Sequence, residues 1–261
     1  MKQQVEPAAR APEVQVFETV EAAQEAAAHI IAEALRPTAT GEMYSIALSG
    51  GSTPRGMHEH LAALPGIDWS RVQVFWGDER TVPPDDDQSN YRMAEESLLS
   101  RVEVDDSHIH RMRGEIDPSK AADEYESELR QVFGDLPAGE FPALDVSVLG
   151  IGSDGHTASL FPGTEALDER ERWVVANFVP QQDTWRITLT YPVLNAARLT
   201  VFLATGAEKV DALYRIFSPT VTDRPPSWYV QPTDGRVIFI LDSASAEGVN
   251  QALAEVNASD E

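Results

Sequence analysis

The chain has 261 residues, of which 42% are hydrophobic, so it can bury a sizeable core in one large domain or two small ones. Its 43 Asp and Glu outnumber its 20 Lys and Arg, and the net charge of -23 repels nucleic-acid phosphates and anionic membrane surfaces. The absence of cysteine excludes disulfides, a thiolate nucleophile and cysteine-based zinc sites.

Residues 1–13 are polar, interrupted by proline and without periodicity, so we expect a flexible arm or a short first strand there. This segment lacks the apolar stretch of a signal peptide, and no run of about 18 apolar residues occurs in the chain. We therefore expect a soluble, unprocessed, cytoplasmic protein with no membrane or nucleic-acid partner. No repeat or linker divides residues 14–257, which are predicted to form one domain.

Apolar periodicity and turn residues predict alternating helices and strands from residue 19 onward. Pro37 ends the first helix, Pro54 is expected as the first residue of the second, and Ser89 is expected to cap the third. The predicted strands are 43–48, 72–76, 108–112, 144–149, 173–178, 184–190, 199–205 and 237–241. The predicted helices are 19–36, one from 54, 89–101, 118–133, 207–217 and 244–256.

This alternation, with strands that are apolar throughout, predicts an α/β fold. We expect a single-domain, doubly wound, mostly parallel sheet of the Rossmann-like type with helices on both faces. Ligands of such sheets bind at the carboxyl ends of the strands. The loops that follow Leu48, Trp76, Leu149 and Thr205 are therefore the places to search for chemistry.

The first of these loops contains Ser49, Gly50, Gly51, Ser52 and Thr53 between a strand and a helix. Glycines let the backbone N–H groups and the helix N-terminus face an anion, and the hydroxyls add donors. The loop therefore predicts a phosphate-binding site. An ordinary strand-to-helix turn is the alternative, because the spacing differs from that of a P-loop and no Lys follows.

The second loop begins with Asp78, Glu79 and Arg80. The planar fork of Arg80 suits an anionic or carbonyl oxygen, but the adjacent acids could equally pair with it. The acidic run 85–87 is expected to be a solvated loop face, and a metal site with Asn90 is the less favoured alternative. We predict no metal.

The third loop contains Gly150, Gly152 and Gly155, which match an isolated dinucleotide-binding pattern. The match lies in mid-chain and the next strand lacks the ribose-binding acid, so a nucleotide is not expected. Asp154 and His156 are two residues apart and would point to one side of an extended loop. Since a histidine can accept a proton near neutral pH, this pair predicts a general base.

Two further cations stand near predicted strand ends. Arg186 lies in the strand 184–190, and Lys209 follows the strand 199–205. Either could neutralise a phosphate held by the first loop, or form an ordinary surface ion pair. The remaining histidines lack the spacing or the third ligand of a metal site, and the Gly-x-Ser-x-Gly elbow of serine hydrolases is missing.

Four blocks in order resemble the 6-phosphogluconolactonase family, and the resemblance covers most of residues 44–242. The most specific blocks are FWGDER with the SNY that follows it, and DGHTASLFPG. The resemblance implies hydrolysis of 6-phosphogluconolactone to 6-phosphogluconate in the pentose phosphate pathway, without metal or organic cofactor. The blocks are ALSGGSTPRGM (47–57), VFWGDERTVPPDDDQSNY (74–91), LDVSVLGIGSDGHTASLFPG (144–163) and RITLTYPVLNAARLTVFLATGAEK (186–209).

The resemblance also implies roles for single residues. His156 is the expected base that activates water, and Asp154 orients it or binds sugar hydroxyls. Arg80 stabilises the developing oxyanion or holds the carboxylate product. The implied substrate- and phosphate-binding residues are Ser49, Gly50, Gly51, Ser52, Thr53, Asp78, Arg186 and Lys209.

Two other functions stay open. Glucosamine-6-phosphate deaminases share the SGGST-type loop and the Asp-Gly-His core, but carry a glutamate before the proline where this chain has Phe161 and Pro162. A non-catalytic sugar-phosphate sensor would keep the phosphate loop without needing His156. The expected partner is the small-molecule substrate, and the expected state is a monomer or weak homo-oligomer.

Overall fold

The computed structural model of this chain describes residues 12–36 and 41–259. Most of the arm predicted over 1–13 lies outside the described residues, and the first strand, β1, spans Glu13–Phe17. Within the described ranges, no helix combines the length and the apolar character that crossing a membrane requires.

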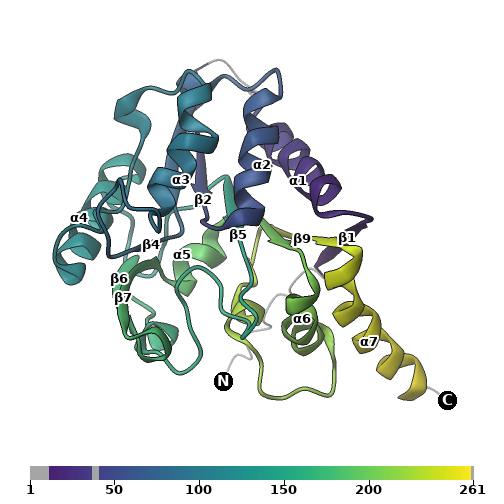
Figure 1. Ribbon diagram of the computed structural model, residues 1–261. Helices are drawn as coiled ribbons and strands as arrows, with labels where there is room; N and C mark the ends of the chain where they lie inside the picture. The colour runs from purple at the N-terminus through teal and green to yellow at the C-terminus, as the bar shows by residue number, and fades with distance from the viewer. Residues whose placement is uncertain (1–11, 37–40, 260–261) are drawn as a thin grey trace.

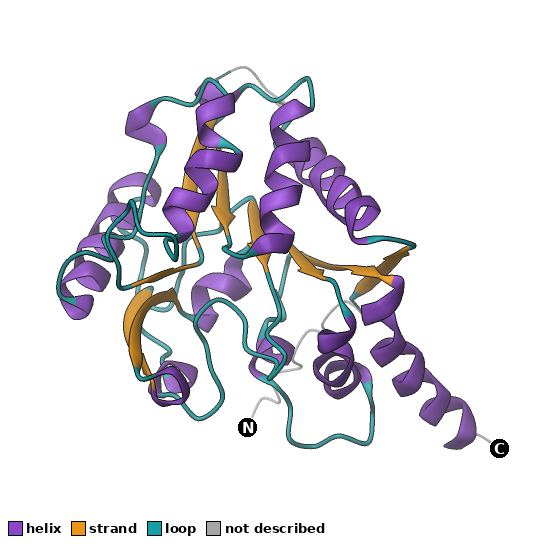
Figure 2. Ribbon diagram, in the orientation of Figure 1, coloured by secondary structure: helices purple, strands orange, loops and turns teal. Residues whose placement is uncertain are grey.

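A six-stranded sheet forms the centre of the molecule, and every neighbouring pair in it is parallel (Figures 1 and 2). Its strand order is β1-β9-β8-β5-β2-β3. The predicted mostly parallel sheet is confirmed. The strands after β1 are β2 (Tyr44–Leu48), β3 (Val72–Trp76), β5 (Val146–Leu149), β8 (Leu199–Ala204) and β9 (Arg236–Asp242).

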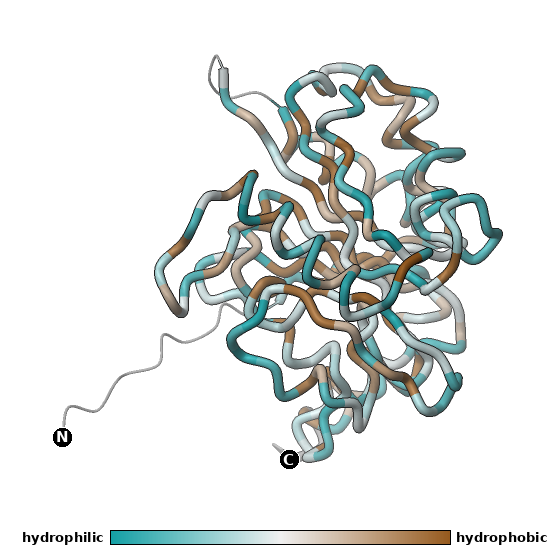
Figure 3. The backbone as a smooth tube through the Cα atoms, turned by 90° about the vertical axis from the view of Figure 1, so that its left-hand side faces the viewer, coloured by the Kyte–Doolittle hydropathy of each residue, from teal (hydrophilic) through white to brown (hydrophobic). Residues whose placement is uncertain are grey.

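Helices cover both faces of this sheet, so the doubly wound architecture is also confirmed. Strand side chains alternate between two hydrophobic clusters, one under each helical layer. Figure 3 shows hydrophobic stretches running through the interior and hydrophilic ones on outer turns. One layer holds α1 (Val20–Ala34), α2 (Ser52–Ala63) and α3 (Asn90–Ser97); the other holds α4 (Pro118–Phe133), α5 (Tyr191–Ala196), α6 (Val210–Phe217) and α7 (Ser243–Ser259).

A second, antiparallel sheet of three strands stands beside the main one, in the order β4-β7-β6. Two of its strands, 173–178 and 184–190, were predicted from the sequence, but as strands of the main sheet rather than of a second one. The third, β4, is so short that no periodicity identifies it. The bounds are β4 (Asp78–Arg80), β6 (Val174–Val179) and β7 (Thr184–Leu189).

Several predicted bounds need correction. The strand expected over 108–112 is wrong: Ile109 makes only an isolated bridge to Val74, and a 3-10 turn spans Asp106–His108. Helix α2 begins two residues before Pro54, and α3 ends at Ser97, ahead of a further 3-10 turn. Helix α5 was not predicted, because its six residues are too few for a helical period to register.

The strand order reverses direction between β2 and β5. From β2 the chain continues outward to β3, whereas from β5 it continues through β8 and β9 toward the other edge. Loops after strands on either side of such a switch point diverge and leave a crevice at the carboxyl ends. The first and third loops predicted to carry chemistry follow β2 and β5. They therefore line the two sides of this crevice.

Candidate active site

A cavity of about 260 Å³ opens at this switch point. Its walls come from the ends of β2 and β5, from β4 and β7 of the small sheet, and from the start of α3. The lining residues are Ser49, Gly50, Asp78, Arg80, Asn90, Gly150, Ile151, Gly152, His156, Ala158, Ser159, Phe161, Gln182 and Arg186.

His156 stands in the loop after β5, here called the catalytic loop (residues 150–161). Its Nδ1 lies 2.6 Å from Asp154 Oδ1, which also accepts the His156 backbone N–H at 3.0 Å. A carboxylate acceptor assigns the proton to Nδ1 and leaves a lone pair on Nε2. Burial alone would raise the pKa of the Asp154 carboxyl, but the hydrogen bonds and charge of His156 lower it. These two bonds fix the orientation of the imidazole ring.

The backbone of the catalytic loop allows this pairing. A Cβ on Gly152 would lie 2.1 Å from His156 Nδ1 and 2.6 Å from Asp154 Oδ1, so only glycine fits beside the pair. Gly155 has a φ of 82° and packs against Pro225. Ala158 has a φ of 47°, a conformation rare outside glycine that is often found at functional sites.

The His156 ring is also held on one face. It stacks on Phe161 with ring centroids 3.9 Å apart and an interplanar angle of 22°. The aromatic contact and the bond to Asp154 together fix the ring, so Nε2 keeps a defined direction. The apolar ring of Phe161 offers no group for proton transfer on this face of His156.

Two arginines line the cavity from the small sheet, on the strands here called the arginine arm (β4 and β7). Arg80 and Arg186 are direct partners in the antiparallel register, so their side chains share one face. Arg80 Nη1 donates to Gln88 O, and Arg186 Nη2 donates to Gln182 Oε1 at 2.5 Å. Among the described residues neither forms an ion pair with a carboxylate.

This pairing of like charges favours an anionic ligand. Burial and the nearby charge of Arg80 lower the pKa of the Arg186 guanidinium. Like charges directly opposite on two strands destabilise the pair unless an anion lies between them. A phosphate or carboxylate group would supply that anion with the fork geometry that arginine prefers.

The acids beside Arg80 do not pair with it. Glu79 is 2% exposed, and its carboxylate accepts the backbone N–H groups of Arg80, Asn90 and Tyr91 at 2.8 Å and the Ser89 hydroxyl at 3.1 Å. Burial raises the pKa of Glu79 against the effect of these donors. Glu79 thus ties β4 to the N-terminus of α3, an interaction that the sequence did not reveal.

Asp78 joins three walls of the cavity. Its carboxylate accepts the Ser159 hydroxyl at 2.6 Å and the Asn90 side-chain amide at 3.3 Å. The same amide donates to Asp78 O at 2.8 Å, which leaves Asn90 Oδ1 buried and without a partner among the described residues. A Cβ on Gly50 would lie 1.8 Å from this oxygen, so the first loop can approach only through glycine.

The first loop reaches the cavity through its leading residues. Ser49 Oγ is buried with no partner among the described residues. Gly51, with a φ of 108°, caps α2 without a side-chain hydrogen bond, so the first N–H groups of the helix are available to a ligand. Thr53 Oγ1 lies 2.9 Å from Thr205 Oγ1, which joins this loop to the end of β8.

Six of the predicted site residues line the cavity, and five do not. Ser49, Gly50, Asp78, Arg80, His156 and Arg186 line the cavity; Gly51, Ser52, Thr53, Asp154 and Lys209 do not. Asp154 contacts the cavity-lining His156, and Lys209 Nζ lies 3.7 Å from Glu208 Oε1. Sequence reasoning missed Asn90, Ser159, Phe161 and Gln182, although the first three lie in the two most specific blocks. Across the described residues no metal-binding cluster of His, Asp or Glu occurs.

The fold and the site together define a class of protein: a mostly parallel α/β protein whose cavity brings two arginines together with a histidine bonded to a carboxylate. The chain belongs to the glucosamine-6-phosphate isomerase/6-phosphogluconolactonase family, whose model matches residues 18–239. It is 44% identical over 204 residues to a 6-phosphogluconolactonase of Nostoc sp., covering 77% of this chain and 83% of that protein. A similar protein of Synechocystis sp. is 44% identical over 209 residues, covering 78% and 84%.

Solved structures agree with this membership. The 6-phosphogluconolactonase from Trypanosoma cruzi superposes with a TM-score of 0.82 at 34% identity, over 90% of this chain and 96% of that one. A monomeric glucosamine-6-phosphate deaminase superposes with a TM-score of 0.74 at 20% identity, over 90% and 98%. At that identity the deaminase shows only that the fold is shared.

Proposed function

We propose that this protein hydrolyses 6-phosphogluconolactone to 6-phosphogluconate, the lactone-opening step of the pentose phosphate pathway. The observation that carries the proposal is the Asp154–His156 pair, set beside two arginines that lack carboxylate partners among the described residues. The relatives named as 6-phosphogluconolactonases support the same activity.

The proposed first step is attack by water on the lactone carbonyl carbon. His156 Nε2 removes one proton from the water as the new C–O bond forms, and Asp154 stabilises the resulting imidazolium through Nδ1–H. The carbonyl oxygen becomes an oxyanion, which we assign to Arg80. The charge of Arg80 is present before the reaction, so no reorganisation is needed when the oxyanion develops.

The second step opens the ring. The tetrahedral intermediate collapses, the bond from the carbonyl carbon to the ring oxygen breaks, and the imidazolium returns its proton to that oxygen. The product is a carboxylic acid that ionises to 6-phosphogluconate. No group other than water is consumed.

The 6-phosphate anchors the substrate in this scheme. We assign it to Arg186 with the loop Ser49–Thr53, whose helix N-terminus adds N–H donors. Asp78 would act by holding Asn90 and Ser159 in the wall. Lys209 would contribute charge from behind this loop, since it does not line the cavity.

We further propose that the reaction takes place in the cytoplasm, without metal or organic cofactor, in a monomer or weak homo-oligomer. The acidic composition, whose net charge of -23 favours a protein dissolved in an aqueous compartment, supports the first of these. Sedimentation at working concentration tests the last.

The test is the initial rate of hydrolysis of freshly generated 6-phosphogluconolactone, corrected for the spontaneous reaction, with glucosamine 6-phosphate assayed in parallel. We expect enzymatic lactone hydrolysis and no ammonia release. If the protein binds 6-phosphogluconate but the lactone is hydrolysed only at the spontaneous rate, the result would favour a sensor. Release of ammonia from glucosamine 6-phosphate would favour a deaminase.

A further inference from the structure

Behind the catalytic pair lies a second cavity, of about 490 Å³, which the proposed reaction does not use. Asp154 forms part of its wall, so the two cavities are separated by the residue that orients His156. The opposite walls come from the segment after the catalytic loop and from the segment before β9. Three arginines line it: Arg170, Arg215 and Arg224.

In a chain with 43 Asp and Glu residues, an arginine without a carboxylate partner indicates a place where an anionic ligand could bind. Among the described residues ten arginines form ion pairs with carboxylates. Arg80 and Arg186 do not, and they line the first cavity. Arg170 and Arg224 also have no carboxylate partner within the described part of the chain, and they line the second.

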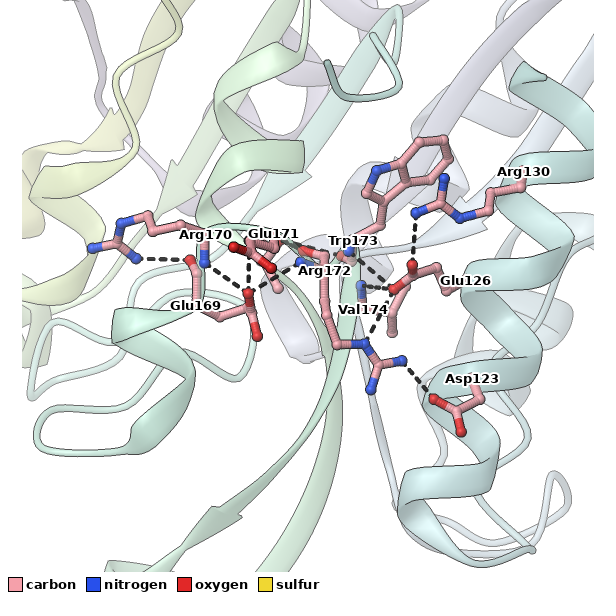
Figure 4. A network of polar contacts seen from close by, with 10 residues as sticks. Asp123, Glu126, Arg130, Glu169, Arg170, Glu171, Arg172, Trp173 and Val174 are labelled. Carbon is pink, nitrogen blue, oxygen red and sulfur yellow. Dashed lines mark hydrogen bonds and ion pairs between the residues drawn. The ribbon is translucent and has the colours of Figure 1, made fainter. Parts of the chain in front are cut away.

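Arg170 is exposed but, unlike its neighbour Arg172, forms no ion pair with an acid in the described part of the chain. Two residues further on, Arg172 Nη2 lies 2.6 Å from Asp123 and its Nε 3.4 Å from Glu126. Figure 4 shows the Arg170 side chain directed away from that acidic pair. Arg170 Nη1 donates to Leu167 O and Glu169 O, both at 2.7 Å, instead.

Arg224 is anchored in the same way. Its Nη1 donates to Arg215 O at 2.8 Å and Ile216 O at 3.2 Å, at the C-terminal end of α6. Its guanidinium carbon lies 5.3 Å from the Trp228 ring centroid. In both arginines the bonds to carbonyls engage Nη1 alone, so the guanidinium is held in place while Nη2 and Nε have no partner among the described residues.

The other walls suit the rest of a small polar molecule. Tyr191 and Tyr229 present rings 6.0 Å apart, and the Tyr191 hydroxyl is engaged with Pro226 O. Asp154 and Asp168 supply carboxylate acceptors for hydroxyl groups. Arg215 is compensated by Asp223 at 3.4 Å, which leaves Arg170 and Arg224 as the cations open to an anion.

We propose that this second cavity binds a small phosphorylated, hydroxyl-bearing metabolite, with its phosphate on Arg170 and Arg224 and its hydroxyls on Asp154 and Asp168. An occupant whose hydroxyl donates to Asp154 draws negative charge from the carboxylate and weakens its bond to His156 Nδ1. Binding therefore lowers kcat for the reaction in the first cavity. The binding site stands on its own residues, and only its effect on kcat rests on the proposed function.

Inorganic phosphate is the probe, titrated at constant ionic strength and followed by calorimetry and by backbone amide shifts. The first cavity is blocked by Arg186→Gln and the second by Arg170→Gln with Arg224→Gln. Each of these proteins should retain one phosphate site, and the triple variant none. Arg236→Gln, which removes an exposed ion pair to Glu13, is the matched control and should retain both sites.

Because Arg224 also holds the end of α6, the double Gln variant could unfold. Replacing both arginines by Lys keeps the charge and a donor for the carbonyls but removes the free edge of the fork. This folded variant should bind phosphate at the second site about tenfold more weakly. Unchanged phosphate binding in the Lys variant, or a single phosphate site in the wild type that Arg186→Gln abolishes, would overturn the site.

Kinetics test the effect on catalysis separately. Glycerol 3-phosphate, which carries both a phosphate and hydroxyl groups, should lower kcat of lactone hydrolysis in the wild type, and the double Lys variant should need about tenfold more of it for the same effect. Binding at the second site with kcat unchanged would overturn the coupling through Asp154. Loss of the second phosphate site on mutation, in a protein that fails to hydrolyse the lactone, would support the site while contradicting the proposed function.

Discussion

The catalytic loop and the arginine arm are two walls of one cavity, but different interactions hold them. The loop is fixed by its own backbone: Gly152 leaves room for His156 and Asp154, and the His156 ring stacks on Phe161. The arm is fixed by the buried Glu79 carboxylate, which binds four donors on β4 and α3. Proton transfer depends on small displacements of one ring, whereas attraction between an anion and two cations falls off more slowly with distance.

Because different interactions hold the two walls, we expect mutations in them to change different kinetic constants. Damage to the loop should reduce kcat with little change in KM, because it misplaces the base only in the transition state. Loss of Arg186 from the arm should raise KM, because phosphate binding contributes to ground state and transition state alike, whereas loss of Arg80, assigned to the oxyanion, should lower kcat.

The largest expected effect is that of His156→Ala. Removal of the general base should lower kcat by about 10² to 10⁴, measured as initial lactone hydrolysis above the spontaneous rate. His29→Ala, on the exposed face of α1, is the control and should leave kcat unchanged. A folded His156→Ala protein with the kcat of the wild type would remove His156 from the mechanism.

Gly152→Ala should follow. The added Cβ would lie 2.1 Å from His156 Nδ1, so the ring must move, and kcat should fall by about 10² with a small change in KM. Ser153→Ala is a close control in the same loop, because that side chain is exposed and lines neither cavity. Equal losses in the two variants would mean that the loop is not held by this contact.

Arg186→Gln should act mainly on KM. Loss of a charge-assisted bond to phosphate costs about 1.5 to 3 kcal/mol, or roughly 10- to 150-fold in KM for the lactone. The variant should also relieve the repulsion with Arg80, so its thermal midpoint should not fall. A variant with the wild-type KM would place the phosphate elsewhere in the cavity.

The smallest expected effect on activity is that of Glu79→Gln, which acts at a distance. The amide keeps one acceptor oxygen but turns a donor toward the Tyr91 N–H or the Ser89 hydroxyl, so stability should fall by about 1 to 3 kcal/mol. KM should rise several-fold as β4 loosens. Glu96→Gln, on the exposed side of α3, should change neither quantity measurably. A rise in KM without loss of stability would contradict a positioning role.

The sequence predicted the fold well where the pattern is local. The strand Val72–Trp76 and the helix Pro118–Phe133 were predicted with their observed bounds, since their apolar residues and flanking Pro or Gly residues mark both ends. The strand predicted over 108–112 is wrong, because pairing with β3 stops at the single Ile109–Val74 bridge and the His110 N–H bond to Val74 O, while the His110 side chain is held by Glu128, Gln73 and the Phe75 ring. Such contacts between distant residues leave no periodic signal.

The same limit applies to the cavity. The spacing of two residues predicts that Asp154 and His156 face one ligand. In the structure they hydrogen-bond to each other across a turn, and only His156 lines the cavity. The register that sets Arg80 opposite Arg186 links residues about a hundred positions apart, and β4 is too short to be predicted. Glu79 was interpreted as a possible partner of Arg80; its real partners lie at the start of α3.

The most direct test of the division between the two walls compares kcat/KM for 6-phosphogluconolactone with kcat/KM for the unphosphorylated gluconolactone. The ratio should be the same in wild type and Gly152→Ala, because the catalytic loop acts on the lactone that both substrates share. It should collapse toward unity in Arg186→Gln, because the arginine arm acts on the phosphate. A ratio that Gly152→Ala lowers, or that Arg186→Gln preserves, would contradict the account.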